Sequence, residues 1–379
     1  MADHDYIILG AGASGLMLAY RMALDTYFED KSILIIDKDK DKGNDRTWCY
    51  WEEGKGEWDN ILHKSWPKIY FGSKNFSKTI DLQDFNYKMV RSQSLYNLLW
   101  DVIDQKPNIN FINDEVKAID ESQNNVKVLT SKKTYEGKKV FNSIANPKHY
   151  NNQKKYPVLQ QHFVGWFIKT KTNQFDDRVA TFMDFSVSQN GNTRFMYVLP
   201  LEKNIALFEY TLFSEKLLKF EEYENAIADY LAREGITEYE IVEKEKGSIP
   251  MTSFKFSKLN SSNVLNIGTA GGWTKASTGY TFRNTTKKTK ELLAFLKHNN
   301  DLSKFHQKTK FWWYDLLFLD VLDKHNGKGS ELFASLFKNA KTRTILRFLD
   351  EESSLSEDLS IITSVPPKQF LTALFKRLF

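Results

Sequence analysis

A glycine turn between a buried strand and a helix, near the start of the chain, constrains the fold more than any other feature. The apolar run from Tyr6 to Leu9 predicts a strand covered on both faces, and it leads directly into the segment GAGASG at 10–15. A stretch with helical periodicity, 16–24, follows, and then a second buried strand at 32–36 that ends in Asp37. This order forms a complete strand–turn–helix–strand unit of the kind that binds nucleotides.

Each glycine of the turn has its own reason to be glycine. Gly10 permits the tight turn, Gly12 lets a pyrophosphate approach the backbone, and Gly15 lets the helix pack closely on the strand. The helix start directs free N–H groups at the phosphate, and the strand-end acid is placed to accept from a ribose 2′-OH. The alternatives are a turn that binds nothing and an acid that merely lies on the surface. In this part of the chain we expect cofactor contacts from Gly10, Gly12, Ala13, Ser14, Gly15, Asp37 and Lys38.

A second glycine-rich segment indicates which dinucleotide is bound. The sequence has a single phosphate-binding fingerprint, so no separate nicotinamide domain is predicted. The segment from Gly268 to Gly272 follows a short buried-type strand, where FAD proteins of this architecture return to touch the flavin. An ordinary loop is the alternative. We favour FAD, with further contacts from Gly268, Ala270 and Gly271.

Two other places are candidates for cofactor binding. Backbone N–H groups at Thr278, Gly279 and Tyr280 are expected to open the helix that follows and to stabilise the anionic edge of a flavin. Arg91 lies at a predicted strand-to-helix junction, where it either pairs with an FAD phosphate or caps the surface.

The order of predicted elements indicates an α/β protein whose nucleotide-binding domain is interrupted by a β-rich substrate domain. The chain from Asp39 to Asp59 is charged and Trp-rich without a clear period, and we expect it to be a long loop. The stretch 126–138 predicts a hairpin, and 140–144 predicts a separate strand. The expected divisions are 1–65, 91–146 and 259–300 for FAD binding, 66–90 and 147–258 for the substrate, and 301–379 for C-terminal helices.

Composition excludes several classes of protein. A single cysteine, Cys49, excludes an internal disulfide framework and multi-cysteine metal sites, and no metal site is predicted. The net charge of +5 over 379 residues gives no nucleic-acid footprint, but it permits attraction to an anionic membrane. No stretch resembles a secretion signal or the ~20 apolar residues of a bilayer span. We expect a cytoplasmic protein that associates peripherally with a membrane.

Several segments together resemble the FAD-dependent bacterial lycopene beta-cyclase family. They are GAGASGLMLA at 10–19, DRTWCYWE at 45–52, QHFVGWFIKT at 161–170, FMYVLPL at 195–201, LFEYT at 207–211, GSIPM at 247–251 and GTAGGWTKASTGYTF at 268–282. The first is generic to flavoproteins, whereas the others in this order are specific. The resemblance implies a Rossmann-type FAD domain joined to a mixed β-sheet substrate domain. It also implies an isomerase that converts lycopene through γ-carotene to β-carotene with reduced FAD, and NADPH as electron donor. Membrane lipid and other carotenoid enzymes are the implied partners.

The same resemblance places the catalytic acid at Glu209, the acid of the LFEYT segment. The family often has a second acid next in this motif, where this chain has Tyr210. Many flavoproteins have an aspartate that holds the ribityl chain where this chain has Thr269, so ribityl recognition stays unassigned. Whether Glu209 or the flavin delivers the proton is also left open.

The residues around Glu209 suit the implied chemistry. A carboxylic acid donates a proton near neutral pH only if burial raises its pKa. Alternation along 205–211 places Glu209 with Leu207 on one face of an apolar strand and Phe208 on the other. An acid at an exposed strand end is the alternative. Aromatic faces stabilise a cation, and the substrate-binding candidates are Trp48, Trp273 and Tyr280, with ordinary core packing as the alternative for each.

A basic amphipathic segment at the C-terminus offers a way to reach an insoluble substrate. It begins at Pro367 and either lies in a membrane interface or packs on its own domain. Its apolar residues at helical spacing are Phe370, Leu371, Leu374, Phe375, Leu378 and Phe379. A flavin-dependent isoprenoid reductase or hydroxylase that consumes NAD(P)H is the rival enzyme, and a pigment carrier is the rival non-enzyme.

Overall fold

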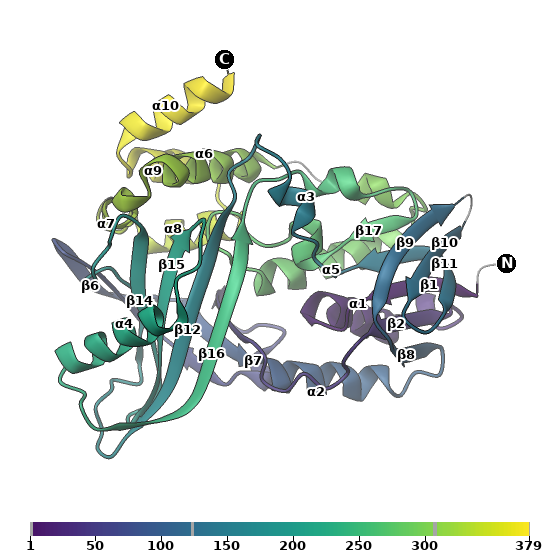
Figure 1. Ribbon diagram of the computed structural model, residues 1–379, viewed down its shortest axis with the longest axis horizontal. Helices are drawn as coiled ribbons and strands as arrows, with labels where there is room; N and C mark the ends of the chain where they lie inside the picture. The colour runs from purple at the N-terminus through teal and green to yellow at the C-terminus, as the bar shows by residue number, and fades with distance from the viewer. Residues whose placement is uncertain (1–2, 123–124, 306–308, 379) are drawn as a thin grey trace.

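Three β-sheets and a set of helices make up the computed structural model, which describes residues 3–122, 125–305 and 309–378. Figure 1 shows the nucleotide-binding sheet at one end of the molecule and the large mixed sheet at the other, with the C-terminal helices above the large sheet. The predicted mixed α/β fold with a helical C-terminal part is confirmed.

The nucleotide-binding sheet has a parallel core. Across the sheet the strands are β8 (Ile109–Asn113), β2 (Ile33–Asp37), β1 (His4–Leu9), β11 (Thr134–Asn142), β10 (Asn125–Thr130) and β9 (Val116–Ser122), and β17 (Val264–Asn266) also pairs with β11. Strands β10 and β9 are antiparallel to their neighbours, and the other pairs are parallel. The side chains of Ile7, Ile8 and Leu9 are fully buried, as predicted for a strand covered on both faces.

Three helices flank this sheet. The first, α1 (Ala13–Leu24), packs against α2 (Ser92–Ile103) and α5 (Phe282–Leu296). Our expectation of a hairpin strand that ends near Lys138 and a separate strand at 140–144 was wrong in part, because β11 is one continuous strand. The side chains of Lys138 and Lys139 leave the strand for partners outside the sheet core, so two adjacent lysines did not interrupt it.

The large mixed sheet is antiparallel except for one parallel pair, β13 with β5. Its strands in order are β16 (Tyr239–Met251), β12 (Leu159–Thr170), β15 (Ile205–Ser214), β14 (Thr193–Glu202), β13 (Val179–Asp184), β5 (Lys68–Ser73) and β6 (Phe76–Asp81). The α4 helix (Phe220–Arg233) contacts β12 and β15 on one face, while helix α7 (Gly329–Asn339) contacts β14 and β5.

A small third sheet was not expected. It consists of β3 (Thr47–Glu53), β7 (Phe85–Arg91) and β4 (Lys64–Trp66). The expected long loop from Asp39 to Asp59 is therefore wrong, because β3 runs through its centre. The strand escaped notice because its partner β7 lies far along the chain and because charged residues surround it. One of those charges, Glu52, is paired with Lys88 and Arg283.

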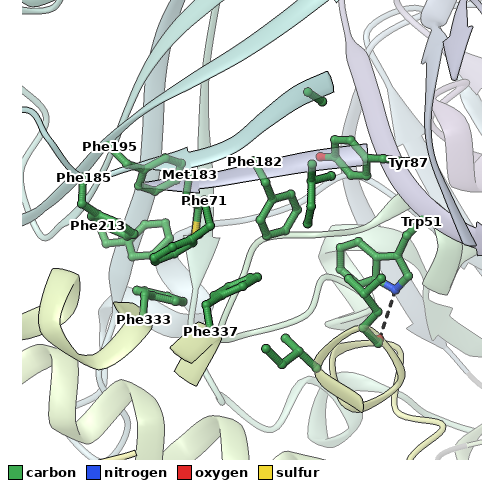
Figure 2. Packing of buried hydrophobic residues seen from close by; sticks show 14 of the residues in the cluster. Trp51, Phe71, Tyr87, Phe182, Met183, Phe185, Phe195, Phe213, Phe333 and Phe337 are labelled. Carbon is green, nitrogen blue, oxygen red and sulfur yellow. Dashed lines mark hydrogen bonds between the residues drawn. The ribbon is translucent and has the colours of Figure 1, made fainter. Parts of the chain in front are cut away.

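The C-terminal helices close the aromatic core over the large sheet. Besides α7 they are α6 (Lys310–His325), α8 (Thr342–Leu349), α9 (Leu355–Thr363) and α10 (Pro367–Leu378), and a short helix, α3 (Lys148–Asn151), precedes β12. Figure 2 shows phenylalanines of the sheet meeting those of α7, and the rings of Phe71 and Phe337 stack at 4.4 Å. The outermost C-terminal residue of our predicted amphipathic segment, Phe379, lies outside the described residues.

Candidate active site

The first glycine turn has the geometry of a phosphate cradle. Gly10 has a φ of +93°, which favours glycine, and a Cβ on Gly15 would lie 2.0 Å from the carbonyl oxygen of Gly10. A Cβ on Gly12, in contrast, would meet no atom within 4 Å. Helix α1 begins at Ala13 without a side-chain cap hydrogen bond, which leaves its first N–H groups available to a ligand. The turn can therefore bind an anion.

Asp37 ends β2 next to this turn. Its carboxylate accepts hydrogen bonds from the backbone N–H groups of Ala11 at 2.6 Å and Asp39 at 3.0 Å. The ammonium of Lys42 lies 3.0 Å away, a contact that sequence reasoning missed, whereas the neighbouring Lys38 is exposed. The acid is thus fixed at the mouth of the glycine turn.

The second glycine segment packs directly on the first. It forms a short 3-10 helix, Gly268–Gly271, in which Gly268 has a φ of +58° and Ala270 is buried. A Cβ on Gly268 would lie 2.3 Å from the hydroxyl oxygen of Ser14, and one on Gly271 would lie 2.1 Å from the carbonyl oxygen of Asn266. The two predicted cofactor segments, far apart in sequence, therefore form one continuous surface.

The turn at Thr278 and Gly279 differs from our expectation. Helix α5 begins only at Phe282, and the N–H groups of Thr278 and Gly279 both donate to the carbonyl of Lys275. These two N–H groups are engaged within the turn and are not free at a helix start. A different polar atom lies here: the buried Oε1 of Gln161 has no hydrogen-bond partner among the described residues, and it faces Gly279.

The carboxyl group of Glu209 is buried in the large sheet. Its side chain is 8% exposed and belongs to the face of β15 that carries Leu207, while Phe208 and Tyr210 pack toward α4, as the alternation predicted. The hydroxyl of Thr211 donates to Oε1 of Glu209 at 2.7 Å. Burial raises the pKa of Glu209 well above its usual range, and the neighbouring carboxylate described next raises it further.

A second carboxyl group, Glu245, lies beside Glu209. Gly165 on β12 pairs with Glu209 of β15 on one side and with Glu245 of β16 on the other. The two carboxyls are hydrogen-bonded to each other, and the hydroxyl of Thr47 donates to Oε2 of Glu245 at 2.7 Å. Burial raises the pKa of Glu245 as well, while Thr47 and the charge of Arg91 oppose that rise. Glu209 is buried and Glu245 is half-buried, and two adjacent carboxyls that are largely withdrawn from water repel each other when both are ionised, so the pair retains one proton.

Sequence reasoning missed Glu245 because it lies in a run of four charged residues, 243–246, a pattern typical of an exposed strand. The signal that could have revealed Glu245 is Gly165, because a lone glycine in an otherwise bulky strand marks a place where another side chain approaches the backbone closely.

Phenol and thiol groups line the space next to the pair. The hydroxyl of Tyr87 is hydrogen-bonded to that of Tyr197 and lies 3.3 Å from that of Tyr280. Burial raises the pKa of all three phenols and of the Cys49 thiol, so each stays neutral near pH 7. The rings of Tyr280 and Trp51 meet edge to face at 4.8 Å. One side of the acid pair therefore faces uncharged, largely aromatic groups.

The structure places two of the predicted aromatic site residues, Trp48 and Trp273, away from Glu209. Trp48 lies on the other face of β3 and stacks on Phe282 at 5.3 Å, within the core of the nucleotide-binding part. Trp273 also packs in that core, and it lines a separate cleft of about 270 Å³. Arg91 is buried, binds Glu243 at 2.5 Å and faces the ring of Phe167 at 4.5 Å. Tyr280 is the one aromatic candidate that reaches the acid pair.

The two glycine segments on a parallel sheet, with a mixed sheet beside them, define the fold of FAD-dependent oxidoreductases and monooxygenases. A geranylgeranyl bacteriochlorophyll reductase-like protein from Thermoplasma acidophilum is similar over 98% of this chain and 95% of its own, with a TM-score of 0.60 and 10% identity. p-Nitrophenol 4-monooxygenase from Pseudomonas putida is similar over 98% of this chain and 97% of its own, with a TM-score of 0.56 and 12% identity. A tryptophan halogenase from Shewanella frigidimarina is similar over 98% of this chain and 92% of its own, with a TM-score of 0.61 and 11% identity.

The family itself follows from the sequence match. The model of the lycopene cyclase protein family matches residues 5–375, so the chain belongs to that family. A search of curated proteins found no match.

Proposed function

We propose that the protein is a lycopene beta-cyclase, an isomerase that closes the linear ends of lycopene into β-ionone rings through γ-carotene. The observation that carries this proposal is the carboxyl of Glu209, which is buried beside aromatic groups and whose pKa is raised by that burial. Ring closure adds a proton to one double bond, forms a carbon–carbon bond as a second double bond captures the cation, and releases a proton from a neighbouring carbon. No electrons are gained or lost overall.

The residues around Glu209 suit each part of this reaction. Glu209 donates the proton, since burial keeps it protonated near neutral pH. Tyr280 lies close enough to Glu209 for the two groups to interact electrostatically, and its ring meets that of Trp51 edge to face. A contact between a cation and an aromatic ring is worth about 0.5–2 kcal/mol. The buried apolar and aromatic residues on this face would keep water, which otherwise adds to the cation, away from the reacting carbons.

The residues of the two glycine segments fit FAD. Two observations support this assignment: the open space over Gly12, and the buried Oε1 of Gln161, which has no hydrogen-bond partner among the described residues. We propose that the turn at 10–15 holds the pyrophosphate, Asp37 the ribose, and the segment at 268–271 the chain between them. When bound in its reduced form, FAD supplies negative charge near the developing cation, and NADPH is the proposed electron donor.

The proposed function is tested with purified protein and lycopene in liposomes under anaerobic conditions, with and without dithionite-reduced FAD. We expect γ-carotene and then β-carotene to form, without stoichiometric consumption of the reductant. Stoichiometric NADPH consumption with a saturated or oxygenated product would instead identify a reductase or hydroxylase. Tight pigment binding without conversion would identify a carrier.

The C-terminal helices offer a surface for peripheral membrane contact. No helix among the described residues is long and apolar enough to cross a bilayer. One side of α10 packs on α6, where Ala373 is buried and Arg377 binds Asp320 at 2.6 Å. Figure 1 shows α10 at the outer edge of the molecule. Its other side and the adjoining α9 expose Leu355, Leu359, Ile362, Leu371, Phe375 and Leu378.

We expect the double substitution Leu371→Ser and Leu378→Ser to weaken binding to anionic liposomes roughly 30-fold. These side chains are 51% and 62% exposed, so each loses about 1 kcal/mol of apolar transfer energy without disturbing the core. Cosedimentation with lycopene-free vesicles measures the effect. The matched control is Leu217→Ser, at a leucine that is 58% exposed elsewhere on the surface. An equal loss in that control would contradict a membrane role for α10.

A further inference from the structure

The geometry points to Glu245 as the partner that keeps Glu209 supplied with its proton: the two carboxyls, carried on β15 and β16, share a single proton across Gly165. This inference rests on the proposed function, because it gives Glu245 a part in the same reaction. It also supplies the second acid that Tyr210 does not provide within the LFEYT segment.

The three strands place the carboxyls so that they meet. Strands β15 and β16 are both neighbours of β12, so about 9–10 Å separates their backbones. Glu209 and Glu245 lie at the same level, because each is the pairing partner of Gly165. A Cβ at Gly165 would lie 2.8 Å from Cδ1 of Leu207 and 3.1 Å from Cγ of Glu245. A side chain at position 165 would therefore crowd Leu207 and Glu245, and glycine leaves room for Glu245 to lean over β12.

Each of the two carboxyls also accepts a hydrogen bond from a threonine hydroxyl. Thr211 donates to Oε1 of Glu209 and Thr47 donates to Oε2 of Glu245, each at 2.7 Å. The hydrogen bond between the two carboxyls completes the set, and it requires that one of them carry a proton.

The charges around the pair decide which carboxyl is protonated. Arg91 acts on Glu245 and favours its ionised form, although Glu243 partly offsets that effect. Glu209 faces no cation among the groups that act on it, and its other neighbours are neutral. These neighbours are Cys49 of β3, Tyr87 of β7, Tyr197 of β14 and Tyr280. The resting pair therefore has its negative charge on Glu245 and its proton on Glu209.

Protons and charges balance over one ring closure at this carboxyl pair. Glu209 gives its proton to the terminal double bond, which leaves two carboxylates beside one carbocation. The carbon–carbon bond of the ring then forms, and the proton lost from the ring returns to the carboxyl pair. The pair ends with one proton and one negative charge, as it began, and no oxidant or reductant is consumed. Glu245 acts through Glu209 and is a positioning residue.

The test compares pH–rate profiles of Glu245→Gln, Glu245→Asp and the matched control Glu240→Gln, an exposed glutamate on the same strand. Glutamine removes the negative charge of Glu245, so the pKa of Glu209 falls and the alkaline limb of the profile moves down by about one pH unit or more. We expect about tenfold less cyclisation than wild type near pH 8 and a loss within about threefold near pH 6. Glu245→Asp restores the limb in part, and the control keeps the wild-type profile.

A second measurement needs neither lycopene nor FAD. The infrared band of a protonated carboxyl, absent in Glu209→Gln, is titrated in the folded wild type and in Glu245→Gln. We expect the band to disappear at a lower pH in Glu245→Gln. An unchanged titration, or an activity loss of equal size at every pH, would overturn the shared-proton pair. Full activity of Glu209→Gln would overturn the proposed acid itself, so the two failures are distinguishable.

Discussion

Replacing Glu209 with glutamine is expected to reduce cyclisation by about 10²–10⁴-fold at every pH, the usual contribution of a general acid. Glutamine has nearly the same volume and still accepts from Thr211, so the sheet stays folded. It has no proton to give to a carbon–carbon double bond. The assay follows β-carotene formation in lycopene-accumulating cells and, with purified protein, in liposomes.

The control for this prediction is Glu240→Gln, the same chemical change at an exposed position of the large sheet. Wild-type flavin binding by Glu209→Gln would show that the cofactor site is intact. β-Carotene output within about threefold of wild type would remove Glu209 from the mechanism and leave the flavin as the remaining candidate donor.

Gly15→Ala is expected to lower the free energy of unfolding, whereas Gly12→Ala is expected to lower the affinity for FAD. At Gly15 the new methyl group would lie 2.0 Å from the carbonyl oxygen of Gly10, a backbone atom that cannot move without disrupting the turn. We expect a loss of about 3 kcal/mol or more in the free energy of unfolding, at the upper end of overpacking effects. Denaturant unfolding of the cofactor-free protein measures this.

At Gly12 the methyl group meets no protein atom, so the free energy of unfolding changes by about 1 kcal/mol or less. The methyl instead occupies the space that we assign to the pyrophosphate, and we expect FAD affinity to fall at least about tenfold. Flavin fluorescence quenching measures that affinity. Unchanged FAD binding by Gly12→Ala would place the cofactor elsewhere.

The parts of the fold that depend on local patterns were predictable from the sequence. Strand β1, its glycine turn and α1 follow from residues that are adjacent in the chain, and the alternation around Glu209 correctly gave its burial. Strand β3 was missed, because its partner β7 lies far along the chain and its flanking charges are neutralised only after folding.

The candidate site was predictable only in part for the same reason. Glu209 follows from one motif, but its pairing with Glu245 depends on the register of three strands that no local pattern reveals. Trp48 follows Thr47 directly in the strand, and successive side chains of a strand point to opposite faces of the sheet. Thr47 therefore reaches the acid pair, while Trp48 packs in the opposite core.

Helix α6 connects the turn that carries Tyr280 with the C-terminal helix α10. Asp315 binds Lys275, whose backbone N–H donates to the carbonyl of Tyr280, and Asp320 binds Arg377 of α10. These two aspartates are about 7–8 Å apart along the helix axis. For the proposed cyclase, this arrangement would let a rod-like hydrocarbon present one end for ring closure while its remaining length stays in lipid, so that only the reacting end has to leave the bilayer.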